Sequence, residues 1–486
     1  MPLRLMNSLT KQLAPFRPRN GRTVRMYTCG PTVYDFAHVG NLRSYLFEDV
    51  LKRVLLRHGY RVRHVMNITD VGHLTDDADQ GEDKLERAAA RQRKSAKQLA
   101  AFYARAFLKD LRRLQVLPAD DLPRATAYIP EQIAFVRRLE RRGYTYTTSD
   151  GVYFDTTKFP AYGSAFGGQE LAEKESGARV AVRAEKRSPH DFALWKLTPP
   201  GVRRQQEWDA PWGRGFPGWH LECSAMGRCL LGQPFDIHCG GIDHIPVHHT
   251  NEIAQSEAAY GTPLAMWWLH GAFLTVEGKR MGKSEGNLIT IDQLIARGID
   301  PLAYRYLVLG AHYRSSLNFT QEAVRGAQSA LDRLRAIARM LPRIPGATED
   351  ARGLARVSRM ITTVEGCAAF DRLSAAFDDD LDTPKALAVV WDTLQNERIP
   401  LGERAAVLAS ADQVFGLGLT KLLGKPLRIP RAVRVLVAAR EAARQGKDWA
   451  RADVLRAQID ALGFHVEDMK DGPAVKPKSH EERHAL

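Results

Sequence analysis

Two cysteines, one histidine and one glutamate in this sequence carry side chains that zinc binds in proteins. Cys29 and Cys223 stand far apart in the chain, whereas His248 and Glu252 are separated by only four positions. On a helix, that spacing places both side chains on one face, where they can reach one metal ion. Zinc accepts cysteine sulfur, histidine nitrogen and glutamate oxygen, so these residues are candidate ligands of one site.

Each of these residues also has an ordinary structural interpretation. A single cysteine is more commonly a small buried apolar residue. A histidine four residues before a glutamate is more commonly part of a solvated helix face. The spacing alone does not show that Cys29 meets Cys223, so the pattern leaves both interpretations open.

The elements that would position these residues follow from the apolar pattern. Residues 24–29 predict a short strand, residues 42–58 predict a helix that ends at Gly59, and residues 62–68 predict a second strand. A strand, a helix and a strand in this order imply a right-handed crossover and a parallel sheet. Ligands of such sheets bind at the carboxyl ends of the strands, and Cys29 lies at one of these ends.

The remainder of the chain divides into further segments. Residues 84–115 predict one long amphipathic helix, and the segment up to 187 predicts an insertion between two halves of the sheet. Residues 195–260 are dense in Gly, His, Trp and Cys, and we expect mostly turns there. The pattern becomes helical after 264, with linkers near 342–346 and 425–430.

Composition limits the class of protein. The chain has 486 residues, which suggests several domains. No apolar run approaches the roughly 20 residues that span a bilayer, and the N-terminus lacks a secretory pattern; we expect a cytoplasmic protein without membrane contact. Five sparse cysteines indicate a reducing compartment rather than a disulfide framework. The net charge of +14 fits a nucleic-acid partner, or a generally basic proteome.

Four blocks of sequence resemble the signature segments of cysteinyl-tRNA synthetases. They are residues 26–35 (MYTCGPTVYD), 67–71 (NITDV), 218–226 (GWHLECSAM) and 248–256 (HHTNEIAQS), and the resemblance runs from about Leu5 to beyond Gly472. It implies an ATP-dependent enzyme that joins L-cysteine to cysteine tRNA in two steps, through cysteinyl-adenylate. We expect a monomer.

The resemblance also implies an α/β fold. A Rossmann-like parallel-sheet catalytic domain with an inserted connective segment would be followed by an all-α helical bundle and a small C-terminal anticodon-binding region. We expect the catalytic domain at 1–118 and 188–260, the insertion at 119–187, and a signature-loop and stem-contact region at 261–345. The tRNA-binding bundle would occupy 346–425, and the anticodon-binding region 426–486.

Residue by residue, the family's zinc ligands fall on Cys29, Cys223, His248 and Glu252, with His249 as the neighbouring alternative to His248. The resemblance thus implies one zinc ion per chain, which would bind the thiolate of the substrate. Because a serine hydroxyl is a much poorer zinc ligand, we expect strong discrimination without an editing domain.

The resemblance also implies a pocket for the amino acid. Four residues are expected to line it: Thr69, Trp219, His238 and Asp243. The alternative interpretation of Trp219 is that its side chain packs in the hydrophobic core rather than lining the pocket. The remaining cysteines, Cys229, Cys239 and Cys367, are expected to be structural thiols.

Class I synthetases carry two ATP signatures, and both are altered in this chain. The first, usually His-x-Gly-His, reads His38-Val39-Gly40-Asn41, and the second, usually Lys-Met-Ser-Lys-Ser, reads Arg280-Met281-Gly282-Lys283-Ser284. A helix N-terminus offers free amide groups to phosphate, and a lysine can neutralise charge on the triphosphate. We expect ATP with Mg²⁺ to bind both signatures and Thr32, and we expect His38, Asn41 and Lys283 to act in catalysis.

Two other functions share some of these motifs. The cysteine ligase of mycothiol synthesis uses similar zinc and ATP motifs without tRNA, but residues 438–471 resemble the end of tRNA-charging enzymes. A tRNA-binding paralogue without catalysis is the other alternative. Its only support is the pair of altered signature positions, Asn41 and Gly282.

Overall fold

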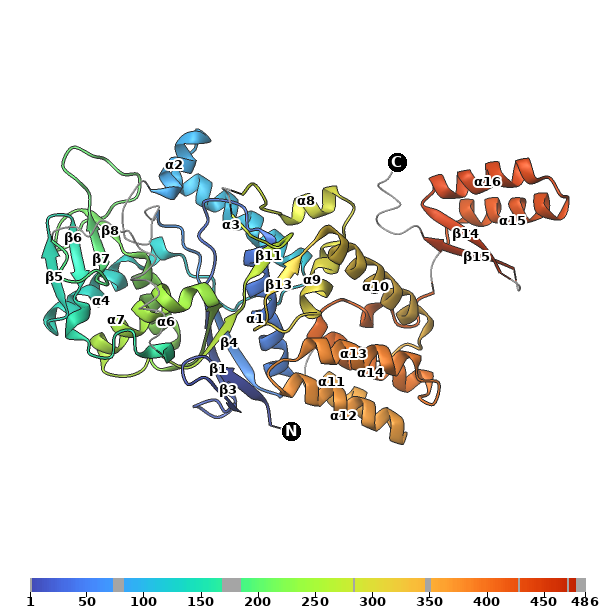
Figure 1. Cartoon of the computed structure of the whole chain (residues 1–486), viewed down its shortest axis with the longest axis horizontal. Helices are drawn as coiled ribbons and strands as arrows, with labels where there is room; N and C mark the ends of the chain where they lie inside the picture. The colour runs from blue at the N-terminus through green and yellow to red at the C-terminus, as the bar shows by residue number, and fades with distance from the viewer. Residues whose placement is uncertain are drawn as a thin grey trace.

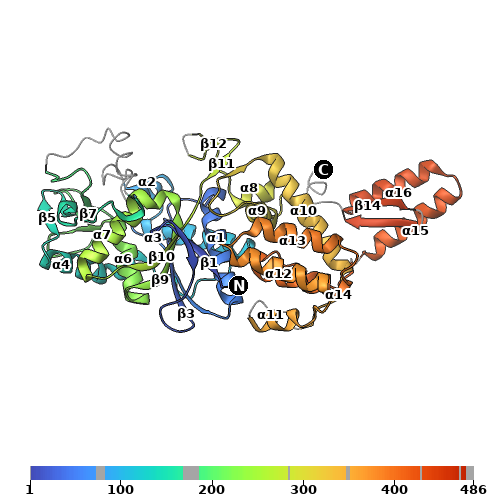
Figure 2. The same ribbon diagram turned by 60° about the horizontal axis from the view of Figure 1, so that its bottom comes forward.

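The computed structural model describes residues 2–72, 83–167, 185–282, 285–345, 351–426, 429–469 and 472–477. The molecule is elongated: the chain begins near its middle, residues coloured cyan to green form one end, and the red C-terminal residues form the other (Figure 1). A small unit of α15 (Arg431–Gln445), α16 (Trp449–Ala461), β14 (Phe464–Met469) and β15 (Gly472–Pro477) projects from the far end in both views (Figure 2). Among the described residues, no helix combines the length and apolar character needed to cross a membrane.

The central sheet has four strands in the order β10 (Ala265–Gly271), β9 (Phe235–Gly241), β3 (Thr23–Thr28) and β4 (Arg61–Met66). All three neighbouring pairs are parallel, and α1 (Val39–Arg57) joins β3 to β4, which confirms the predicted crossover. From β3 the chain passes through α1 to β4, which pairs with one edge of β3. The other edge of β3 pairs with β9, which comes much later in the sequence. The strand order therefore reverses between β3 and β9, the usual position of a ligand in such sheets.

The long helix that we predicted at 84–115 is wrong. The structure has two helices, α2 (Lys84–Arg91) and α3 (Ala96–Arg113). Between them Arg93 takes a positive φ of 51°, which a continuing helix does not tolerate. Ser95 then caps α3, and its side chain and that of Gln98 bond reciprocally to each other's backbone N–H.

Turns do not dominate residues 195–260, contrary to our prediction. This segment contains the second half of β7 (Phe192–Leu197), followed by β8 (Gly215–Pro217), α6 (Trp219–Leu231), β9 and α7 (Thr250–Tyr260), with one π-helical turn, η5 (Ile245–His249), before α7. Its glycines allow close packing instead. For example, a Cβ on Gly218 would lie 2.0 Å from the carbonyl oxygen of Ala193.

A second sheet covers the opposite end of the molecule from the C-terminal unit (Figure 1). It is antiparallel and consists of β5 (Thr145–Thr148), β6 (Gly151–Phe154), β7 and β8. The helix α4 (Ile129–Arg141) packs near it. This sheet extends past residue 187, where we expected the insertion to end. The domain ranges themselves stay a prediction.

The rest of the chain is mainly helical, in agreement with the predicted fold class. The elements are α8 (Ile291–Ala296), α9 (Pro301–Leu309), α10 (Gln321–Met340), α11 (Ala351–Ser358), α12 (Val364–Asp378), α13 (Thr383–Gln395) and α14 (Leu401–Phe415). Short strands complete it: β1 (Arg4–Asn7) with β2 (Gln12–Pro15), and β12 (Lys279–Arg280), β11 (Leu274–Val276) and β13 (Leu317–Phe319) in one sheet.

A buried charge network connects the catalytic sheet to the helices that follow it. Asp49 of α1 accepts hydrogen bonds from Arg53 at 2.8 Å and from Arg305 of α9 at 2.5 Å. Arg305 also donates to the carbonyl oxygen of Phe415, the last residue of α14. Burial raises the pKa of Asp49, but the two guanidinium groups outweigh burial and lower it. Asp49 and its partner Arg305 thus connect three helices, α1, α9 and α14.

Asp49→Asn should therefore destabilise the whole molecule. Removing one charge of a buried, hydrogen-bonded group leaves its partners uncompensated and costs about 3–5 kcal/mol. Urea unfolding followed by circular dichroism measures the change. The matched control is Asp292→Asn, whose ion pair with Arg113 is largely exposed and should contribute less than about 1 kcal/mol. Equal losses in both variants would contradict a special role for the buried network.

Candidate active site and metal centre

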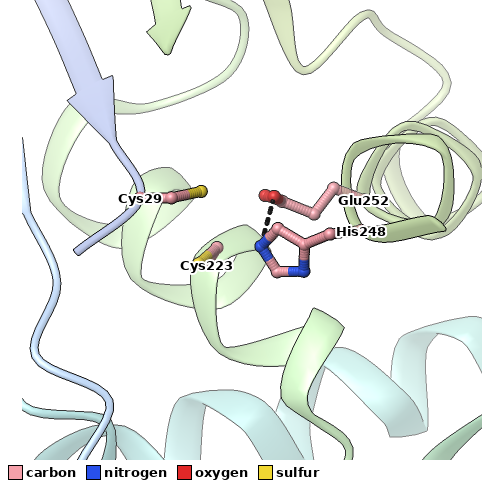
Figure 3. A group of neighbouring side chains, drawn as sticks. All are labelled: Cys29, Cys223, His248 and Glu252. Atoms are coloured by element: carbon pink, nitrogen blue, oxygen red, sulfur yellow. Dashed lines mark ion pairs between the residues drawn. The ribbon is translucent and has the colours of Figure 1, made fainter. Parts of the chain in front are cut away.

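The structure brings the four candidate metal ligands together from four different elements. Cys29 follows β3, Cys223 lies in α6, His248 in η5 and Glu252 in α7. One ligand atom from each lies within 4.8 Å of the others, and all four residues are buried. Figure 3 shows the two sulfur atoms, the imidazole and the carboxylate facing a common point. The sequence alone left the meeting of the two cysteines open.

His248 and Glu252 act as a pair, as their spacing predicts. The Nε2 atom of His248 lies 3.0 Å from Oε1 of Glu252 (Figure 3). The other carboxylate oxygen, Oε2, lies 3.2 Å from Nε2 of His238. Within the described part of the chain, Oε1 has this charge contact but no partner in hydrogen-bond geometry. A buried carboxylate oxygen in this state fits a metal ligand, because burying an acceptor without a well-formed hydrogen bond is otherwise costly.

A second set of four residues overlaps the first. Cys29 and Glu252 also lie within 4.8 Å of His238 and His249, and Nε2 of His249 is 3.3 Å from the sulfur of Cys29. The alternative histidine therefore remains geometrically possible. The first set has two thiols rather than one, and thiolate favours zinc.

Histidines outside the predicted ligand set hold these imidazoles in place. Nδ1 of His248 lies 3.1 Å from Nδ1 of His220, and Nδ1 of His249 lies 2.7 Å from Nε2 of His270. Metal-binding histidines typically bond a second group in this way, which fixes the ring and its tautomer. Sequence reasoning missed His220 and His270, although His220 stands inside the block at 218–226.

The electrostatics of the cluster favour a cation. A hydrogen bond from Cys29 lowers the pKa of Cys223 to about 6, whereas burial raises the pKa of Cys29. Burial alone would raise the pKa of Glu252, but His238 and His248 outweigh it and lower the value to about 2. Burial also lowers the pKa of His248, yet the nearby Glu252 carboxylate raises it to about 10. The Glu252 carboxylate and the Cys223 thiol thus favour positive charge at this place.

Glycine is required directly after Cys29. A Cβ on Gly30 would lie 1.6 Å from the carbonyl oxygen of Asn67, so only glycine lets these two segments touch. The Gly30 N–H donates to Oδ1 of Asn67 at 2.7 Å, and Nδ2 of Asn67 donates to Oγ1 of Thr69 at 2.9 Å. The end of β3 is therefore fastened to the segment that follows β4.

The four predicted residues of the amino-acid pocket fall into two groups. Trp219 and Asp243 line a cavity of about 850 Å³ that also includes Cys29. The Trp219 ring stacks on His248, with 4.5 Å between centroids and 10° between planes. Thr69 and His238 instead lie buried behind the cluster, where Thr69 donates to Glu222 at 3.0 Å and His238 contacts Glu252.

The same cavity reaches both expected ATP signatures. Its lining includes every described residue of the predicted ATP site: Thr32, His38, Gly40, Asn41, Arg280, Met281 and Gly282. Lys283 and Ser284 lie outside the described residues. Cys29 of the candidate metal cluster and the described residues of both ATP signatures thus line one continuous space.

The altered Asn41 has a structural partner. His38 caps α1 by accepting from the Asn41 N–H at 3.3 Å, and Oδ1 of Asn41 accepts from the His38 N–H at 3.3 Å. This reciprocal pair fixes the helix N-terminus without a charged side chain. A Cβ on Gly40 would lie 3.0 Å from the His38 ring and 3.2 Å from the Met281 sulfur. Glycine thus lets the two signatures approach each other.

A residue that we did not single out shapes the second signature. Asn287 accepts from the Gly282 N–H and donates to the Arg280 carbonyl oxygen, both at 3.0 Å. Its side chain thus bonds to the backbone on both sides of Met281, and so restrains the backbone at Gly282, where glycine stands in place of the usual serine. The sequence alone could not indicate this role, because asparagine is common in turns that contain glycine.

Two family models match the chain. The model described as the catalytic domain of class I (C) tRNA synthetases matches residues 15–329. The model described as the cysteinyl-tRNA ligase anticodon binding domain matches residues 428–473.

Similar full-length proteins support these matches. The chain is 50% identical to cysteine–tRNA ligase 1 of Burkholderia lata, over 97% of this chain and 96% of that protein. It is 40% identical to cysteine–tRNA ligase of Treponema denticola, over 96% and 98% of the two chains. Among solved structures, methionyl-tRNA synthetase of Mycobacterium tuberculosis with methionyl-adenylate has a TM-score of 0.53 at 16% identity, covering 83% of this chain and 92% of that one. At 16% identity, the similarity to this synthetase structure shows a shared fold and nothing about function.

The close approach at Gly30 generates a direct test. Gly30→Ala should lower the free energy of unfolding by about 3 kcal/mol or more, since a backbone oxygen occupies the position of the new methyl group. Thermal unfolding measures this loss. Gly326→Ala is the control, because it lies inside α10 with no described heavy atom within 4 Å of its Cβ position; it should be neutral or stabilising. A neutral Gly30→Ala variant would refute the proposed contact.

Proposed function

Because the chain belongs to the cysteinyl-tRNA synthetase family, we propose that its cavity joins L-cysteine to cysteine tRNA with ATP, and that one zinc ion selects the substrate thiol. The observation that supports the proposal is that one cavity is lined both by Cys29, a member of the buried two-thiol cluster, and by the described residues of the two ATP signatures. The anticodon-domain match at 428–473 favours tRNA over an aminoglycoside as the acceptor. We further propose a cytoplasmic monomer, in which the bundle at 346–425 contacts tRNA and 426–486 reaches the anticodon.

Cys29, Cys223, His248 and Glu252 would hold the zinc ion. Two sulfurs, one nitrogen and one oxygen are a donor set that zinc accepts, and Oε1 of Glu252 lies 3.0 Å from Nε2 of His248 within the cluster. When bound, zinc would accept the thiolate of cysteine and lower the pKa of that thiol. His220 and His238 act as positioning residues, because each contacts one of these side chains.

The residues around the cluster would orient the amino acid. Trp219 forms a wall of the cavity and packs flat on His248, so it limits the size of a side chain at this position. Asp243 also faces the cavity and offers a carboxylate to the α-ammonium group. Thr69 donates to Glu222, the residue that precedes Cys223 in α6. A serine substrate would leave the polar site poorly satisfied, and such rejection can reach about 10⁴–10⁵.

In the first step, the carboxylate of cysteine attacks the α-phosphorus of ATP, and pyrophosphate leaves. The protein supplies position and charge rather than a nucleophile. His38 and Asn41 fix the N-terminus of α1, which presents free amide groups to phosphate. Arg280 and Lys283 would neutralise the triphosphate together with Mg²⁺.

In the second step, a hydroxyl of the terminal adenosine of tRNA attacks the acyl carbon, and AMP leaves. The oxygen–carbon bond of the ester forms as the bond to the adenylate oxygen breaks, and the hydroxyl proton leaves with the departing phosphate or solvent. Both steps use the same cavity, so the 3′ end of the tRNA must enter it after adenylate has formed.

Metal removal tests the role of the cluster. Enzyme stripped with a chelator should lose cysteine charging, and added Zn²⁺ should restore it; Cys223→Ala should lose charging and bound zinc together. Cys229→Ala is the matched control, because Cys229 is an exposed cysteine of the same helix. Full charging by zinc-free enzyme would rule out the zinc hypothesis.

Substrate selection is tested by comparing cysteine with serine. Pyrophosphate exchange should favour cysteine in kcat/KM by about 10⁴ or more, since serine cannot provide a thiolate. The same comparison separates an active enzyme from a non-catalytic tRNA-binding paralogue, which would show no exchange with either amino acid.

Lys283→Ala tests the second ATP signature. Removal of a cation that stabilises transition-state charge should lower kcat of pyrophosphate exchange by about 10²–10³ with little change in the KM for cysteine. Lys279→Ala is the control, since Lys279 is an exposed neighbour in β12. Similar small effects in both variants would remove Lys283 from the mechanism.

A further inference from the structure

Three aromatic side chains gather at the mouth of the catalytic cavity. Phe36 lies in the segment before His38, and Phe102 and Tyr103 lie in α3. The Phe36 ring is 5.0 Å from that of Tyr103 and 5.9 Å from that of Phe102, and both pairs meet edge to face. Phe36 and Tyr103 line the cavity. We call these three residues the mouth aromatics.

The exposure of this group needs a reason. Phe36 is 42% exposed and Phe102 is 37% exposed, although each would gain by burial of its ring. The two rings are in contact with each other and continuous with the cavity wall, so they form one apolar surface rather than scattered residues. Such surfaces mark binding sites.

The segment that carries Phe102 and Tyr103 is basic. Residues 87–109, which include the end of α2 and most of α3, contain seven Lys and Arg residues and no Asp or Glu. One of them, Lys94, has its Nζ atom 4.6 Å from the centre of the Phe102 ring. A cation placed over an aromatic face beside exposed rings suits a ligand that carries both negative charge and flat π-systems.

The reactants differ in how well they match this surface. Cysteine has neither an aromatic ring nor a chain of negative charge, and its side chain belongs at the metal cluster. ATP has one base, and its phosphates belong at the two signatures. The unpaired 3′ end of the tRNA combines consecutive bases with a phosphate backbone, and it must enter the same cavity to reach the adenylate.

We propose that Phe36 and Phe102, with Lys94, form a stacking platform for the unpaired 3′-terminal nucleotides of the tRNA. The bases would lie against the exposed rings, and the basic segment 87–109 would attract the backbone phosphates. Tyr103 is the buried support that holds the two rings in position. This assignment rests on the proposed function and deepens it, because it names where the acceptor end binds.

The test separates tRNA transfer from adenylate formation. Phe36→Leu and Phe102→Leu keep an apolar side chain but remove the π-system, whereas Phe36→Tyr and Phe102→Tyr keep both. Each leucine variant should lower kcat/KM for cysteine tRNA by roughly ten-fold, the loss expected for one stacked base. Cysteine-dependent pyrophosphate exchange, which needs no tRNA, should stay within about two-fold of the unaltered enzyme. The tyrosine variants should retain both activities.

A truncated tRNA provides the second measurement. The leucine variants should bind intact cysteine tRNA more weakly than the unaltered enzyme, but should bind tRNA that lacks its 3′-terminal trinucleotide equally well. An equal loss with truncated tRNA would overturn the proposal, since the rings would then contact another part of the tRNA. A parallel fall in pyrophosphate exchange, or no effect at all, would also overturn it. Failure of the unaltered enzyme to exchange pyrophosphate with cysteine would instead reject the proposed function.

Discussion

Four side chains that can donate electron pairs to a metal converge in the interior of this protein, and the contacts of the neighbouring residues keep them together. Two sulfurs, one imidazole and one carboxylate lie within 4.8 Å of one another, and all of them are buried. Without a cation this cluster would concentrate buried negative charge, which is costly. The surrounding contacts follow from that constraint: Gly30 lets β3 and the segment after β4 touch, and His220 and His238 hold the ligands from outside.

One helix links this constraint to the remainder of the molecule. The N-terminus of α1 carries the first ATP signature, and its reciprocal cap between His38 and Asn41 replaces the usual second histidine. Three turns later, Asp49 joins the same helix to Arg305 and the end of α14. The position of the ATP signature therefore depends on packing against the helices that follow the catalytic sheet.

The sequence predicted the local elements around the site better than it predicted their partners. Short-range patterns gave β3, α1 and β4, and the spacing of His248 and Glu252 was sufficient to place them face to face. The break before α3 carried a readable signal, the capping pair of Ser95 and Gln98, but the continuing apolar periodicity outweighed it in our prediction.

Tertiary contacts explain the other misses. The glycines and histidines of residues 195–260, considered without the rest of the fold, suggest turns. In the folded molecule this segment packs with the sheet and forms helices and strands. Cys29 and Cys223 are 194 positions apart, so only the fold shows that they meet. The roles of His220, His238 and Asn287 depend on partners that no periodicity reveals.

X-ray absorption at the zinc edge is the most direct measurement of the central claim. Zinc-loaded enzyme without substrate should show two sulfur neighbours at about 2.3 Å, from Cys29 and Cys223. Addition of cysteine should raise the number to three, and addition of serine should leave it at two. A sulfur count that does not rise with cysteine would contradict the account, because the metal would then not select the substrate by its thiol.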